Sequence, residues 1–187
     1  SGISNKKTIH CNENGYFSMY TSDRYGFNNP DSVWDSIDSS VLMVGDSFLH
    51  GSCLNRPHDL ASLLRKKIRK NFINVGYSDN GPLIELVSLK EFWQETVNYV
   101  LWFYYEGNDL EGIIKEKQNP ILMKYLTNYK FRQNIREKQS QIDAMAYKLL
   151  KKEYQKKKIE KKQHEKILDQ LIKFLKINKT RDLFSVK

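Results

Sequence analysis

Three short apolar segments, each followed by a polar loop that contains glycine, constrain the fold of this chain most. They are residues 41–44, 72–76 and 99–105, and helical patterns that begin at Pro57 and Pro82 separate them. Helices between successive buried strands favour a parallel sheet with right-handed crossovers. Because functional groups in such sheets gather at the carboxyl ends of the strands, we expect the three following loops to meet at one edge.

The sequence predicts three regions. Residues 1–40 are rich in Asn, Asp, Ser, Gly and Tyr and predict an irregular arm, with a short strand near Tyr16–Tyr20. Residues 41–132 form the predicted α/β core, in which the apolar strand 99–105 should be buried. Residues 133–187 predict a basic helical segment, because apolar residues recur there at helical spacing.

The aromatic residues of the predicted arm allow two interpretations. Tyr16, Tyr20, Tyr25 and Phe27 either line a carbohydrate pocket or pack the arm onto the sheet. The pattern does not favour one over the other.

Two cysteines limit the sulfur chemistry of the chain. Cys11 and Cys53 are too few for a disulfide scaffold or for a cysteine-based zinc site. They can form one bridge if the protein is exported, but sequence alone does not establish the pairing.

The positive charge is confined to the C-terminal part of the chain. Residues 1–110 hold 10 Lys/Arg and 13 Asp/Glu, a net charge of −3, whereas residues 111–187 hold 21 and 9, a net charge of +12. The lysines of 151–162 predict a solvated helix face. Without arginine or interleaved aromatic residues they do not favour base stacking, so we expect no nucleic-acid partner.

The three loops carry the groups that an acyl-transfer site needs. They begin Gly45-Asp46-Ser47, Gly76-Tyr77-Ser78-Asp79 and Gly107-Asn108-Asp109. A hydroxyl serves as nucleophile, and backbone N–H groups with a carboxamide stabilise the oxyanion of the tetrahedral intermediate. This chemistry requires neither a metal nor a cofactor.

These motifs resemble those of the SGNH or GDSL hydrolases. Gly45-Asp46-Ser47-Phe48 is similar to the first block of the family, and Glu106-Gly107-Asn108-Asp109 is similar to the third. The resemblance implies a three-layer, flavodoxin-like α/β fold with Ser47 as nucleophile. It places the oxyanion hole at Ser47, Gly76, Asp79 and Asn108, and gives Asp46 and Asp109 supporting roles.

Four segments are similar in sequence to longer bacterial SGNH-like proteins: residues 12–16, 23–31, 45–48 and 102–110. In those proteins the region that contains these segments often follows an N-terminal membrane anchor, which fits an opening without Met. The resemblance thus implies a truncated fold, an acylated small molecule or glycan as substrate, and a domain outside the cytoplasm. Otherwise the chain is cytoplasmic.

The sequence departs from the family pattern at two points. The family base is a His in an Asp-x-x-His block, and none of His10, His50, His58 and His164 stands in that context. We assign His50 a structural or substrate-contacting role. Asp79 stands where the family has its oxyanion glycine, and a carboxylate there opposes an oxyanion. Gly76 or Gly81 is the expected substitute.

These departures leave a second function open. A non-catalytic module of the same fold would dock on a membrane or a partner through its basic helix. A third possibility, nucleic-acid binding through residues 133–176, predicts affinity that falls steeply with salt. A sheet of three strands would also expose an apolar edge, which predicts marginal stability or self-association.

Overall fold

The structure is a computed structural model that describes the backbone of residues 2–13, 15–51, 53–107 and 109–184. It divides into two compact units, Ser1–Asp143 and Ala144–Lys187. The first unit is a mixed α/β domain and contains all the strands of the described residues. The second unit consists of most of the last helix.

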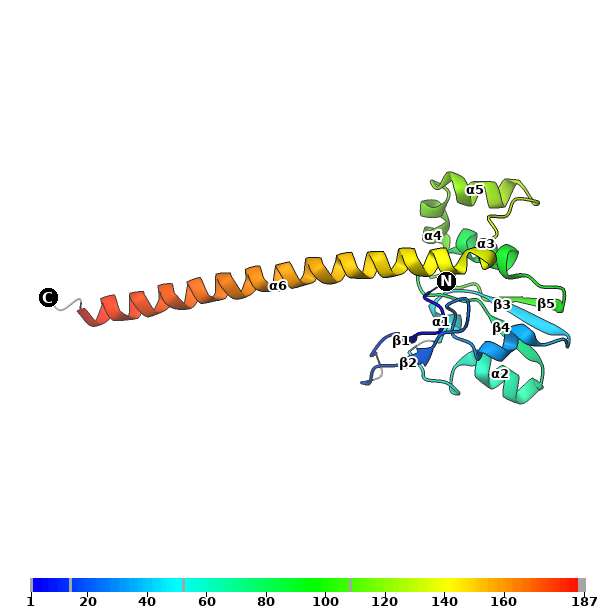
Figure 1. The fold of residues 1–187 in the computed structure, drawn as a ribbon, viewed down its shortest axis with the longest axis horizontal. Coiled ribbons are helices and arrows are strands. Elements are labelled where there is room, and N and C mark those ends of the chain that lie inside the picture. Colours follow the sequence, from blue (N-terminus) through cyan, green and yellow to red (C-terminus); the bar gives the residue numbers. More distant parts are fainter. Residues whose placement is uncertain (1, 14, 52, 108, 185–187) are drawn as a thin grey trace. The chain divides into compact units, whose positions relative to one another are not determined.

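The first unit contains a small hairpin and a three-stranded parallel sheet (Figure 1). The hairpin pairs β1 (Lys7–Ile9) with β2 (Met19–Thr21), and the sheet has the order β4-β3-β5. The sheet strands are β3 (Ser40–Val44), β4 (Asn71–Asn74) and β5 (Val97–Trp102). The helices are η1 (Asp31–Asp35), α1 (Ser47–His50), α2 (Leu60–Ile68), α3 (Pro82–Phe92), α4 (Asp109–Glu116), α5 (Pro120–Thr127), η2 (Arg136–Lys138) and α6 (Gln139–Phe184).

The parallel sheet and its crossover helices confirm the coarse prediction of an α/β fold. β3 lies in the centre and is buried along its whole length. Its alternate side chains point to opposite faces of the sheet. Leu42 and Val44 enter one apolar cluster, whereas Val41 and Met43 enter another.

Helices cover both faces of the sheet. α2 supplies Ala61 to the cluster around Met43, and α3 supplies Phe92 to the cluster around Leu42. Pro82 at the first turn of α3 presets the helical backbone where an N–H would lack a partner in any case. Figure 1 shows α2 and α3 on opposite sides of the strands.

The predicted N-terminal arm is part of the core. Phe27 and Trp34 are buried against the sheet. Buried Asp23 organises the turn that carries them, because its carboxylate accepts the N–H groups of Tyr25 and Phe27, the amide of Asn29 and the indole of Trp34 at 2.7–2.9 Å. Of the four aromatic residues with two interpretations, Phe27 and Tyr25 pack against the core and Tyr20 is buried, whereas Tyr16 is exposed.

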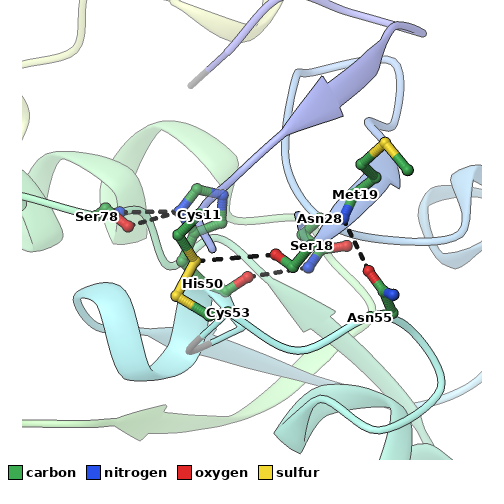
Figure 2. Close-up of a disulfide and its surroundings, with 8 residues drawn as sticks. All are labelled: Cys11, Ser18, Met19, Asn28, His50, Cys53, Asn55 and Ser78. Carbon is green, nitrogen blue, oxygen red and sulfur yellow. Dashed lines mark hydrogen bonds between the residues drawn. A yellow bond between two sulfur atoms is a disulfide. The ribbon is translucent and has the colours of Figure 1, made fainter. Parts of the chain in front are cut away.

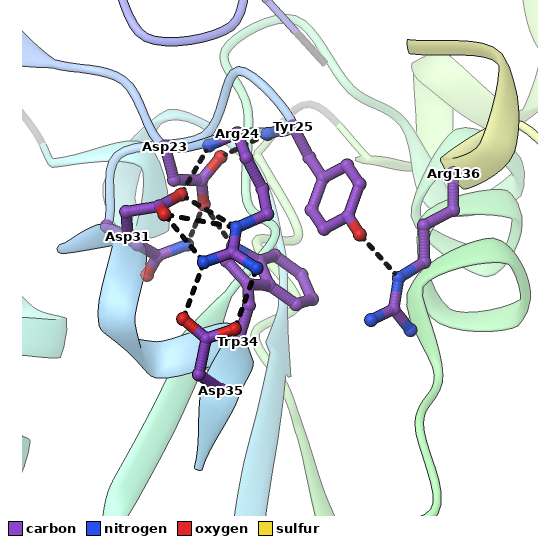
Figure 3. A network of polar contacts seen from close by, with 8 residues as sticks. Asp23, Arg24, Tyr25, Asp31, Trp34, Asp35 and Arg136 are labelled. Carbon is purple, nitrogen blue, oxygen red and sulfur yellow. Dashed lines mark hydrogen bonds and ion pairs between the residues drawn. The ribbon is translucent and has the colours of Figure 1, made fainter.

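An ion-pair network lies on the outside of the same turn (Figure 3). Arg24 bonds Asp31 at 2.7 Å and Asp35 at 2.6 Å. On the other side, the guanidinium of Arg136 donates to the hydroxyl of Tyr25 at 3.0 Å. This last bond ties residues far apart in the sequence into one unit.

The boundary between the two units differs from the predicted one. The sequence placed it after residue 132, whereas the compact units divide after Asp143. Glu91 of α3 accepts the backbone N–H groups of Gln133 and Ile135, and Asp143 accepts both the N–H and the hydroxyl of Ser4. Residues 133–143 therefore belong to the α/β unit.

The prediction that strand 99–105 is buried is wrong. β5 lies at the edge of the sheet, and the exposed fractions of its side chains include 58% for Tyr99 and 43% for Trp102. A continuous apolar run looks the same in a central strand and in an uncovered edge strand, so the pattern alone did not distinguish them.

The second unit is helical from Ala144 to Phe184. Its side chains are exposed throughout residues 150–168. No helix in the described part of the chain combines the length and the hydropathy needed to cross a membrane.

Candidate active site

The short helix α1 connects the loops that follow the three parallel strands. At its start, the ring of Phe48 contacts the ring of Tyr105, which follows β5, with centroids 5.2 Å apart. At its end, His50 bonds Ser78, which follows β4. The predicted meeting of the three loops at the carboxyl edge of the sheet is therefore observed.

Ser47 is the first residue of α1 and is half-buried. The preceding Asp46 is buried and caps the helix, because its carboxylate accepts the N–H of Phe48 at 3.0 Å. Such a cap satisfies an N–H that the helix itself leaves unpaired. Asp46 thus fixes the turn that presents the Ser47 hydroxyl.

Gly76 has a packing role in this structure. A Cβ at this position would lie 2.7 Å from the Leu49 side chain, so only glycine lets β4 and α1 approach this closely. Its N–H donates to the Asn74 carboxamide at 2.8 Å. That bond occupies the N–H that an oxyanion would need. The N–H of Gly81, the other expected substitute, donates to Glu116 at 2.9 Å.

Asp79 adopts a backbone conformation that favours glycine. It has a φ of 65° and is exposed, and the N–H of Asn80 donates to the carbonyl of Tyr77 at 3.3 Å. Asp79 is thus the third residue of a tight turn, a position that often carries glycine when φ is positive. Its N–H remains a candidate oxyanion donor from this loop.

The loop after β5 is held by Asp109. The Asp109 carboxylate accepts the N–H of Tyr105 at 2.7 Å, and its own N–H donates to the Tyr105 carbonyl at 3.1 Å. These bonds hold Tyr105 and Asp109 together. Asn108, the predicted carboxamide donor, lies outside the described residues.

His50 lies in a buried aromatic cluster. Its Nδ1 accepts the N–H of Ser78 at 3.1 Å and lies 2.9 Å from the Ser78 hydroxyl. Because a backbone N–H can only donate, the ring proton is on Nε2 and points to the hydroxyl of Tyr20 at 2.8 Å. Its ring also contacts those of His10 and Tyr77, at 4.1 and 4.5 Å between centroids.

This environment gives His50 a structural role. Burial, together with the adjacent His10, lowers its pKa to about 3. A base with so low a pKa draws a proton from a hydroxyl only weakly. Both ring nitrogens are also occupied, and no hydrogen bond joins Ser47 to a histidine among the described residues.

A disulfide fastens the hairpin to the segment after α1. Cys11 and Cys53 are bonded, with Cα atoms 5.3 Å apart (Figure 2). The same contact is reinforced by a bond from the N–H of Met19 to Asn55 at 2.8 Å. The bridge left open by the sequence is therefore present, and it holds the hairpin beside the His50 cluster.

Three buried carboxylates lie near the site. Asp46, Glu85 and Asp109 are each at most 2% exposed, and each has one oxygen without a hydrogen-bond partner in the described part of the chain. Burial is the main cause that raises the pKa of Glu85, the hydrogen bond from Trp102 lowers it, and the negative charges of Asp109 and Asp46 raise it; the resulting pKa is about 7. Glu85 therefore carries its proton through much of the acidic range.

Several of these site residues were not predicted from the sequence. Glu85 lies among apolar residues of a helix, and nothing in its spacing indicates burial. Tyr20 and Ser78 are brought to His50 by contacts across 30 and 28 residues. Among the described residues, no group of three or more His, Cys, Asp or Glu side chains is arranged to hold a metal ion.

Comparisons with models of protein families, with curated proteins and with solved structures find no match to this chain. The resemblance to SGNH hydrolases therefore depends on the motif residues themselves.

Proposed function

We propose that the chain carries a serine acyl-transfer site and acts as an ester hydrolase or O-acyl transferase. The observation that supports this most is the position of Ser47. It lies half-buried at the carboxyl edge of a parallel sheet, in a turn fixed by Asp46 and next to the loops that follow the other two strands. Active sites of open α/β sheets lie at this edge.

In the proposed reaction, the Ser47 oxygen attacks the carbonyl carbon of an ester while a base takes the hydroxyl proton. The tetrahedral intermediate then expels the alcohol, which takes up a proton, and leaves an acyl-enzyme that water or a sugar hydroxyl resolves. The N–H groups of Ser47 and Asp79 and the carboxamide of Asn108 are the proposed oxyanion donors, each contributing about 3 kcal/mol. The carbohydrate substrate is proposed from the family resemblance.

The disulfide supports a location outside the cytoplasm, since such bonds persist in oxidising compartments. A membrane anchor remains part of the same proposal.

Labelling with a fluorophosphonate tests the nucleophile directly. We expect an adduct on Ser47 that Ser47→Ala abolishes. Ser78→Ala is the matched control, because Ser78 is another half-buried serine whose hydroxyl lies 2.9 Å from a histidine nitrogen. Since no described histidine bonds Ser47, added imidazole should accelerate labelling by acting as the base. Folded protein that gives no adduct, with or without imidazole, would refute the proposal.

The exposed lysines of α6 support a second candidate, a non-catalytic module that docks on an anionic membrane surface. All seven lysines of residues 151–162 are exposed in the second unit. Lysines near an anionic surface contribute about 1 kcal/mol each. Co-sedimentation with phosphatidylserine vesicles should then fall with salt, and equal sedimentation with neutral vesicles would exclude it.

A further inference from the structure

The two outer edges of the parallel sheet differ in whether other residues of the domain cover their backbone groups. The outer edge of β4 is covered by side chains. The carboxamide of Asn29 accepts the N–H of Asn74 at 3.1 Å and donates to its carbonyl at 2.7 Å. Arg65 donates to the carbonyl of Phe72 at 2.8 Å. Asn29 thus imitates the peptide group of a neighbouring strand.

The outer edge of β5 has no such cover. The N–H of Phe103 donates to the carbonyl of Val44 at 2.8 Å, so the backbone groups of Phe103 and Leu101 face β3. Those of Val100 and Trp102 then face away from the sheet. Among the described residues, no strand or side chain hydrogen-bonds them.

The side chains of β5 also lack the devices that normally protect an edge strand. Val97–Trp102 contains no charged residue and no proline, although lysine and proline are the usual guards against strand addition. From Tyr99 to Tyr104 the exposed fraction of the large apolar side chains, Phe103 aside, runs from 36% for Val100 to 58% for Tyr99. Among the described residues, the one cation that lies over an aromatic ring of this strand is Lys70, whose Nζ is 5.1 Å from the centroid of the Tyr99 ring.

We propose that β5 pairs with β5 of a second copy of the chain, in antiparallel orientation, so that two sheets become one. The strand is complementary to itself in one register. With Val100 opposite Trp102 of the second copy, and Trp102 opposite its Val100, four hydrogen bonds satisfy all eight outward backbone groups. The two-fold axis then passes between the two copies of Leu101.

This register also pairs the side chains favourably. Leu101 of one copy lies opposite Leu101 of the other, in a pair that exchanges no hydrogen bonds, where the two Cα atoms are about 4.5 Å apart. On the other face, Val100 meets Trp102 in an aliphatic–aromatic cross-strand pair of the kind that stabilises sheets. Because Val97–Trp102 carries no charged residue, the two strands themselves bring no like charges together.

The apolar area that β5 pairing can bury limits how stable the dimer can be. Aromatic side chains bury about 150–250 Å² when fully covered, so the half-exposed residues from Tyr99 to Tyr104 offer roughly 450 Å² per copy. The pair then buries roughly 900 Å², below the roughly 1,200 Å² of the smaller stable interfaces. We therefore expect a reversible dimer that forms as concentration rises.

Sedimentation velocity of the full chain over a concentration series tests the pairing. The wild type should shift from monomer to dimer. Leu101→Glu and Leu101→Lys should each be monomeric, because each places like charges on the axis, and an equimolar mixture of the two should form the mixed dimer. Ile37→Glu is the matched control, since Ile37 is 93% exposed and lies outside the sheet.

A cross-linking variant tests the pairing without adding a charge, in case a charge at residue 101 unfolds the sheet. Leu101→Cys should form an intermolecular disulfide, because the expected Cα separation suits one, whereas Ile37→Cys should not. A wild type that remains monomeric throughout, a Leu101→Glu variant that dimerises as the wild type does, or charge variants that remain unpaired when mixed would overturn the proposal.

Discussion

The buried carboxyl of Glu85 should make the stability of the protein fall as pH rises. Burial raises its pKa from the ordinary 4.5 to about 7, so the folded state binds this proton more tightly than the unfolded state does. Stability is then lost progressively from about pH 4.5 to about pH 7. Since one pKa unit is worth about 1.4 kcal/mol, the full loss is about 3 kcal/mol.

Glu85→Gln isolates this effect. The amide oxygen can still accept the indole N–H of Trp102, which now donates to Glu85 Oε2 at 2.5 Å. Urea unfolding at a series of pH values should show the variant gaining about 3 kcal/mol on the wild type between pH 4 and pH 8. A difference between the two proteins that does not change with pH would refute the reasoning.

The Trp102→Phe variant tests the pKa of the Glu85 carboxyl in a second way. The indole hydrogen bond favours the charged form of Glu85 and lowers its pKa. Its removal should move the pH window of the stability loss upward. Carbon NMR of the Glu85 carboxyl would follow the shift directly, and a window that moves downward would contradict the assignment.

Three further effects follow from the packing of the N-terminal region. Replacing Cys11 and Cys53 together by serine removes a cross-link between residues 42 positions apart. The free energy of unfolding, measured with urea, should fall by about 4 kcal/mol, because the unfolded chain gains freedom. A loss below about 1 kcal/mol would contradict this chain-entropy argument. Burial depresses the pKa of His50 to about 3, so the contribution of His50 to stability should be lost as pH drops from about 6.5 to about 3, and His50→Gln should remove that contribution in thermal scans. Asp23→Ala leaves four donors, three of them buried, without their acceptor. It should lower the unfolding free energy by at least about 4 kcal/mol, since an unsatisfied donor costs about 1–3 kcal/mol; a change within about 1 kcal/mol would show that water replaces the carboxylate.

Continuous apolar runs and Pro82 made the α/β core predictable, whereas the helix expected from Pro57 begins at Leu60. Residues 41–44 are β3 within one residue, and Pro82 marks the first residue of α3. These signals are local, because burial on both faces requires apolar side chains at successive positions. The meeting of the three loops followed from the geometry of a parallel sheet rather than from any single residue.

The polar interactions around the site were not predictable in the same way. Asn29 bonds Asn74 across 45 residues, and His50 bonds Tyr20 across 30. An asparagine in a turn has the same sequence signature whether it bonds its own loop or a distant strand. The integration of the predicted arm into the core was missed for this reason, since its side chains follow no helical or strand period.

The coverage of β4 by Asn29 and Arg65 has a consequence for assembly. A sheet with two accessible edges can add copies at both, and growth of that kind has no natural end. Here one edge already holds its hydrogen bonds within the molecule. In the proposed dimer, pairing at β5 uses up the remaining free edge of this sheet, so growth through the sheet stops at two copies instead of continuing into a fibre. Replacing Asn29 would uncover backbone groups at the edge of β4, so that further copies could add there.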